Sequence, residues 1–107
     1  MNNKDEKKRE ILRALAAEFF SRESNRQSLI TITNVEFYSR GNRAIILATV
    51  LPAEEETRAV EFMNRKLSDF REYVMENSRI ARIPYFEARI DIGEKNRQRI
   101  DQIAKNE

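Results

Sequence analysis

The chain has 107 residues, a length that suits one domain with a modest core. It contains no cysteine and no histidine, which excludes disulfides, thiolate zinc sites and the commonest general base at neutral pH. Charged residues make up 36% of the chain but the formal net charge is only +2, so binding to a polyanion requires a local basic patch.

The first part of the chain is predicted to form one amphipathic helix. Residues 1–8 are polar, and we expect them to be frayed. Apolar residues then recur at helical spacing, which predicts a helix over about residues 4–22. These apolar residues are Ile11, Leu12, Leu15, Ala16, Phe19 and Phe20. A polar break follows at residues 24–27.

Residues 29–38 and 43–51 are predicted to form a β-hairpin, because both segments are rich in residues that favour strands. The turn between them contains Gly41 and Asn42, which both tolerate positive φ. The alternation of the first strand slips near Asn34, which predicts a bulge. The second strand is almost continuously apolar, so we expect it to be buried on both faces.

The segment after the second strand is predicted to form a helix with an interruption. Pro52 ends the second strand, and the glutamates at 54–56 suit the first turn of a helix. Ser68 and Asp69 are weak helix formers that favour N-caps, and Asp69 has capping-box spacing to Glu72. One kinked helix or two short helices therefore fit as well as one straight helix. The apolar stripe of this segment consists of Val60, Met63, Leu67, Phe70 and Val74.

A third strand is predicted after Pro84, because apolar and polar residues alternate there with a period of two. Asp91 and Glu94 have the spacing of a helix cap, which predicts a helical tail over residues 93–107. The apolar face of the strand consists of Phe86, Ala88, Ile90 and Ile92, and the polar face of Tyr85, Glu87, Arg89 and Asp91.

The predicted order is helix, strand, strand, helix, kink, helix, strand, with the helical tail at the end. Three strands covered on one face by helices form a two-layer α+β sandwich. This order is that of the type II KH fold, a module that binds single-stranded RNA. We therefore expect a single KH-like domain over residues 1–107.

Three blocks of sequence, taken in order and spacing, carry a resemblance to a known family. They are LITITNVE at 29–36 continuing through 43–51, NRKLSDFR at 64–71, and RIARIP at 79–84 followed by Asp91 and residues 99–101. On these blocks, and over about residues 9–103, the chain resembles ribosome-binding factor A, a bacterial factor in maturation of the small ribosomal subunit.

The resemblance implies a KH-like domain in which an Ala-x-Gly kink replaces the usual Gly-x-x-Gly loop. It also implies binding to the 16S ribosomal RNA of the immature 30S subunit, with a role in late maturation and pre-16S rRNA processing. In this chain the kink reads Lys66-Leu67-Ser68, with neither alanine nor glycine.

The candidate RNA-binding residues fall into three groups around predicted breaks in the chain. Arg65, Lys66, Ser68 and Arg71 surround the kink, Arg79 and Arg82 precede the third strand, and Arg40 and Arg43 flank the hairpin turn. Helix N–H groups and arginines at such places bind phosphates. For the kink group, a solvated face with acidic partners at 69, 72 and 76 remains an alternative.

Packing is the favoured interpretation of the remaining aromatic residues and of two methionines. Tyr85 beside Arg89 fits base stacking, although packing on a neighbouring strand or on the tail helix is the favoured interpretation. Met63 and Met75 are expected to be packing residues, as are the phenylalanines at 19, 20, 62, 70 and 86.

The composition favours a binding protein over an enzyme. An acylphosphatase-like site at Asn42 and Arg43 needs a glycine-rich phosphate loop, and the chain has only Gly41 and Gly93. We expect no cofactor and no metal, no membrane span or signal peptide, a cytoplasmic location and a monomer when free. The alternative to RNA binding is a KH-like protein-interaction module that docks on a ribosomal or other protein, which the small net charge keeps open.

Overall fold

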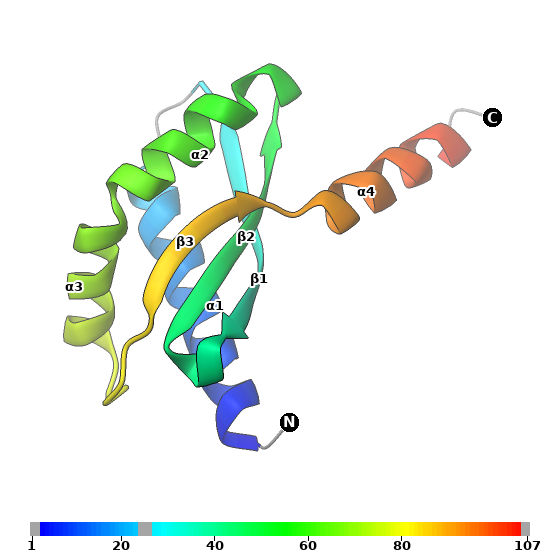
Figure 1. Cartoon of the computed structure of the whole chain (residues 1–107). Helices are drawn as coiled ribbons and strands as arrows, with labels where there is room; N and C mark the ends of the chain where they lie inside the picture. Colours follow the sequence, from blue (N-terminus) through cyan, green and yellow to red (C-terminus); the bar gives the residue numbers. More distant parts are fainter. Residues whose placement is uncertain (1–2, 24–26, 106–107) are drawn as a thin grey trace.

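The computed structural model describes residues 3–23 and 27–105, so residues 24–26 of the predicted polar break at 24–27 lie outside the described residues (Figure 1). The predicted order of elements is confirmed. The elements are α1 (Asn3–Glu23), β1 (Leu29–Tyr38), the 3-10 turn η1 (Ser39–Gly41), β2 (Arg43–Leu51), the 3-10 turn η2 (Ala53–Glu55), α2 (Glu56–Arg65), α3 (Leu67–Asn77), β3 (Tyr85–Ile90) and α4 (Ile92–Lys105).

Within the described residues the three strands form one sheet in the order β1-β2-β3. Strand β2 pairs antiparallel with β1 and parallel with β3. Helices α1, α2 and α3 pack against one face of this sheet, while α4 extends away from it (Figure 1). The architecture is the expected two-layer α+β sandwich. The buried core consists of Leu12, Ala16, Phe19, Phe20, Ile32, Val35, Ala44, Ile46, Ala48, Met63, Phe70, Val74 and Ala88.

The predicted bulge in β1 is present, since the pairing with β2 shifts between Ile32 and Asn34. Because of the extra residue, the buried position before the bulge has an even number, Ile32, and the buried position after it has an odd number, Val35. Side chains on both sides of the bulge therefore still point toward the helices.

The prediction that β2 is buried on both faces holds only in part. Ala44, Ile46 and Ala48 are buried beneath the helices, whereas on the other face Thr49 is buried but Ile45 and Leu47 are only half-buried. The reason is that α1, α2 and α3 cover one side of the sheet and leave most of the other side open. A central strand is apolar here because its neighbours β1 and β3 shield it, not because a second layer covers it.

The hairpin turn uses left-handed backbone at three successive residues. Ser39, Arg40 and Gly41 have φ values of 53°, 57° and 86°, while Asn42 is in the right-handed helical region at −75°. Of the two turn residues that tolerate positive φ, Gly41 therefore adopts it and Asn42 does not. Arg40 is exposed at this tip despite the steric cost that a side chain meets in such a conformation.

The predicted kink is present, but its position differs from the expected cap at Ser68 or Asp69. Lys66, with φ −96° and ψ 5°, separates α2 from α3. Its N–H donates to the carbonyls of Phe62 and Met63 at 3.2 and 3.1 Å, and its own carbonyl accepts from Phe70 at 2.9 Å. Hydrogen bonding of helical type thus continues across the bend, so a side-chain cap is not required there.

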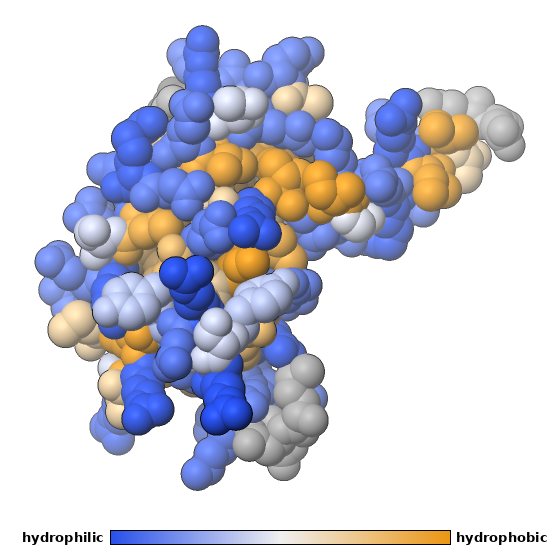
Figure 2. Space-filling view, viewed as in Figure 1, coloured by the Kyte–Doolittle hydropathy of each residue, from blue (hydrophilic) through white to orange (hydrophobic). Residues whose placement is uncertain are grey.

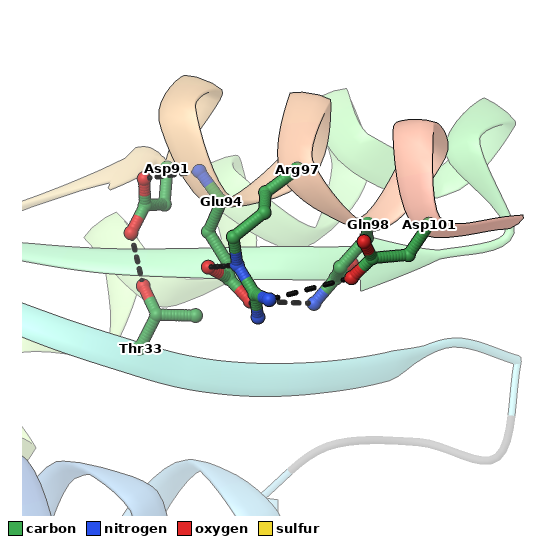
Figure 3. Close-up of polar contacts among 6 residues, drawn as sticks. All are labelled: Thr33, Asp91, Glu94, Arg97, Gln98 and Asp101. Atoms are coloured by element: carbon green, nitrogen blue, oxygen red, sulfur yellow. Dashed lines mark hydrogen bonds and ion pairs between the residues drawn. The ribbon is translucent and has the colours of Figure 1, made fainter. Parts of the chain in front are cut away.

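The predicted cap of the last helix is confirmed (Figure 3). Oδ1 of Asp91 accepts a hydrogen bond from the backbone N–H of Glu94 at 3.0 Å, and Oδ2 accepts one from the hydroxyl of Thr33 at 2.6 Å. Asp91 therefore ties the start of α4 to the bulge of β1. Ile92, which the alternation placed on the apolar face of β3, instead begins α4 and is 61% exposed.

Replacement of this cap gives a first testable result. Asp91→Ala removes both hydrogen bonds and is expected to lower the free energy of unfolding by about 1 kcal/mol, measured by urea denaturation. The matched control is Glu94→Gln, which weakens the surface ion pair with Arg97 but keeps the capped N–H, and should change stability by less than about 0.5 kcal/mol. A loss in Asp91→Ala no larger than that in Glu94→Gln would contradict a stabilising role of the cap.

Candidate nucleic-acid interface

Arg79 and Arg82 lie on the loop between α3 and β3, and both side chains are exposed. The backbone of this loop is nevertheless fixed. The hydroxyl of Ser78 donates to the carbonyl of Val74 at 2.8 Å and accepts from the N–H of Ile80 at 3.3 Å. Ile80 and Ile83 pack on the core, and Pro84 is fully buried. The loop therefore presents two arginines to solvent from an anchored backbone.

Arg71 holds the end of the same loop. Its Nη1 donates to the carbonyl of Pro84 at 2.7 Å and its Nη2 to the carbonyl of Ile83 at 2.9 Å. The guanidinium also lies 5.0 Å from the centre of the Tyr85 ring. Of the candidate arginines, Arg71 is thus committed to contacts within the fold, and it positions the loop that carries Arg79 and Arg82.

Arg40 and Arg43 lie at the same end of the sheet as this loop. The N–H of Tyr85 donates to the carbonyl of Asn42 at 2.9 Å, and Arg43 pairs in register with Tyr85. The hairpin turn and the loop before β3 meet at this edge (Figure 1).

The residues Arg40, Arg43, Arg79 and Arg82 together are called the arginine end below. All four side chains are exposed, and within residues 3–23 and 27–105 none of them has an acidic partner in an ion pair. The structure therefore places two of the three groups that the sequence separated at the same end of the sheet.

The kink group lies elsewhere on the molecule. Helix α3, with 11 residues, separates Lys66 from the loop by about 16 Å. Nζ of Lys66 lies 3.8 Å from a carboxylate oxygen of Glu23 and 3.9 Å from one of Asp69, while Arg65 and Ser68 are exposed. The acidic partner expected at position 69 is present. The kink therefore forms a separate and partly neutralised basic group, and does not continue the arginine end.

Tyr85 does not pack as favoured from the sequence. Its side chain is 72% exposed on the uncovered face of the sheet, where the guanidinium of Arg71 lies beside its ring. Met75, also expected to pack, is 63% exposed on α3. Sequence reasoning also missed Tyr38, which pairs in register with Arg43. The sequence could have identified Tyr38 as a neighbour of Arg43, because a short turn fixes which residues face each other in a hairpin.

Two side-chain pairs set the charge of the uncovered face. The hydroxyl of Tyr38 donates to Oε2 of Glu36 at 2.8 Å, and this hydrogen bond raises the pKa of Tyr38. Arg89 forms an ion pair with Glu87 at 3.0 Å, and this contact raises the pKa of Arg89. Tyr38 stays neutral and Arg89 stays cationic at neutral pH. The carboxylates of Glu36 and Glu87 therefore have partners.

Comparison with known proteins identifies the fold. No family model matches the chain, and no curated protein matches it either. Among solved structures, the crystal structure of ribosome-binding factor A from Thermus thermophilus superposes with a TM-score of 0.66, at 18% identity, over 77% of this chain and 90% of that chain. The chain has the ribosome-binding factor A fold.

A second structure agrees with this result. It is the solution NMR structure of a Thermotoga maritima protein described as a candidate ribosome-binding factor A, with a TM-score of 0.63, 22% identity, and coverage of 76% of this chain and 80% of that one. The expected KH-like α+β fold and the predicted resemblance are thus confirmed at the level of the fold. No helix in the described part of the chain is long and apolar enough to cross a membrane.

Proposed function

We propose that this protein is a non-enzymatic, cytoplasmic ribosome assembly factor. It binds the 16S ribosomal RNA of the immature 30S subunit and assists late maturation and pre-16S rRNA processing. The observation that carries the proposal is the arginine end on a ribosome-binding factor A fold: four exposed arginines without acidic partners in the described residues, held by a fixed loop and a tight turn. The sequence blocks that resemble that family support the same conclusion.

The proposed mechanism is binding. The arginine end contacts phosphates, and occupancy stabilises one conformation of the immature RNA over another, which shifts a folding equilibrium without any covalent step. Because phosphate contacts release counterions from the RNA, affinity depends strongly on salt.

Co-sedimentation with purified 30S subunits, 50S subunits and 70S ribosomes tests the proposal. We expect binding confined to 30S subunits. If each of the four arginines neutralises one phosphate, the slope of log affinity against log salt is about −3, or roughly a 50-fold loss between about 50 and 200 mM salt. Binding that ignores salt, or equal binding to 50S subunits, would contradict the proposal.

A second candidate is a protein-interaction module that docks on a ribosomal or other protein. The observation in its favour is the apolar side of α4, where Ile92, Ile100 and Ile103 are 61%, 65% and 55% exposed. A binding assay with protein-free 16S ribosomal RNA separates the two candidates. The RNA-binding function requires that the protein bind this RNA. The docking function requires that the protein bind complete 30S subunits but not the protein-free RNA.

A further inference from the structure

The face of the sheet opposite the described helices has an ordered arrangement of side chains. Residues that pair in register across strands point to the same side. The row nearest the hairpin turn runs Tyr38 on β1, Arg43 on β2 and Tyr85 on β3. The next row has Ile45 between two glutamates at 36 and 87. Segments far apart in the chain thus place one arginine between two tyrosines.

This row borders a shallow hollow. The hollow has a volume of about 450 Å³ and is lined among others by Tyr38, Arg43, Ile45, Tyr85 and Arg89. Its size lies in the range of pockets that hold small ligands. Figure 2 shows an apolar band across the upper middle of the molecule and mostly hydrophilic side chains over the end of the sheet that carries the hairpin turn.

The tyrosine rings are accessible and oriented. Tyr38 is 46% exposed and held at its hydroxyl by Glu36, while Tyr85 is 72% exposed. The contact of Arg71 with the Tyr85 ring fixes its orientation, and the large exposed fraction leaves room for a second planar group.

The charges favour a polyanion over a basic or neutral partner surface. Glu36 is engaged by Tyr38 and Glu87 by Arg89, whereas Arg43 has no ion-pair partner in the described residues. The hollow lies at the end of the sheet that carries the hairpin turn, since Ser39 and Arg43 line it. Exposed aromatic side chains with adjacent cations on a sheet are the arrangement by which proteins stack the bases and hold the phosphates of single-stranded nucleic acid.

We infer that Tyr38, Arg43 and Tyr85 form a platform that binds single-stranded RNA, with bases stacked on the two tyrosines and a phosphate on Arg43. The inference rests on the proposed function for the identity of the partner. It adds the form of RNA recognised: an unpaired segment, since bases inside a duplex cannot reach a ring on a flat face.

The test uses the full chain and fluorescein-labelled decauridylate and decaadenylate, with a duplex as comparison. The chain has three tyrosines and no tryptophan, so stacking is expected to quench its intrinsic tyrosine emission. The variant Tyr38→Leu/Tyr85→Leu should bind about tenfold more weakly for each ring removed, measured by fluorescence anisotropy. The matched variant Tyr38→Phe/Tyr85→Phe keeps both rings and should bind within about twofold of the original protein.

The outcomes separate this inference from the proposed function. If the protein binds 30S subunits but the leucine variant binds the oligomers as well as the original chain, or if no oligomer binds at all, the platform is wrong and the proposed function stands. If oligomers bind with tyrosine quenching while 30S subunits do not, the platform stands and the ribosomal role fails. Equal affinity for the duplex would overturn the platform, because duplex binding needs only phosphate contacts.

Discussion

Charge reversal at Arg79 and Arg82 together is expected to weaken binding to 30S subunits more than tenfold and to reduce the magnitude of the salt slope by about 1.5. Each reversal removes one phosphate contact and adds repulsion toward the next phosphate. Neither arginine forms an ion pair in the described residues, so the folded state should lose no stabilising contact. The measurement is co-sedimentation of the variant at several salt concentrations, beside its urea denaturation curve.

A matched variant controls for net charge. Arg58→Glu/Arg99→Glu makes the same change in charge at exposed positions on α2 and α4. Arg58 follows the carboxyl end of β2, and is therefore at the opposite end of the sheet from Arg43. This control should retain most of its affinity. A similar loss in both variants would indicate that the overall field matters and that the arginine end is not the interface.

The sequence predicted the features of the fold that depend on local patterns. Alternation located β3, the slip near Asn34 located the bulge, and Asp91 with Glu94 located the cap of α4. It failed where the answer depended on layers that no local pattern records. The apolar run of β2 has the same pattern whether one or two layers cover the sheet, so burial on both faces was predicted and one face was found only partly buried.

The candidate site was predictable as a set of residues but not as an arrangement. Arg40 and Arg43 meet the loop of Arg79 and Arg82 only because β3 pairs parallel to β2 with Arg43 opposite Tyr85. Parallel pairing joins segments that are distant in the chain, and its register has no short turn to fix it. The alternation of β3 did place Tyr85 on the polar face of the strand, which is the open face of the sheet.

Arg71 gives the second large expected effect, because it joins α3 to the loop before β3. Arg71→Ala leaves the carbonyls of Ile83 and Pro84 without their charged donor, and Pro84 is buried. We expect the free energy of unfolding to fall by about 2 kcal/mol, measured by urea denaturation. By comparison, Arg65→Ala at the exposed end of α2 should change stability by less than about 0.5 kcal/mol.

Arg71→Lys separates positioning from direct phosphate binding. Lysine keeps the positive charge but lacks the planar fork that reaches two carbonyls at once. If Arg71 positions the loop, the lysine variant loses stability and also loses 30S affinity, because Arg79 and Arg82 are no longer held. If Arg71 instead binds phosphate directly, the lysine variant keeps its affinity, since a point charge suffices for a phosphate. The two hydrogen bonds at 2.7 and 2.9 Å favour positioning.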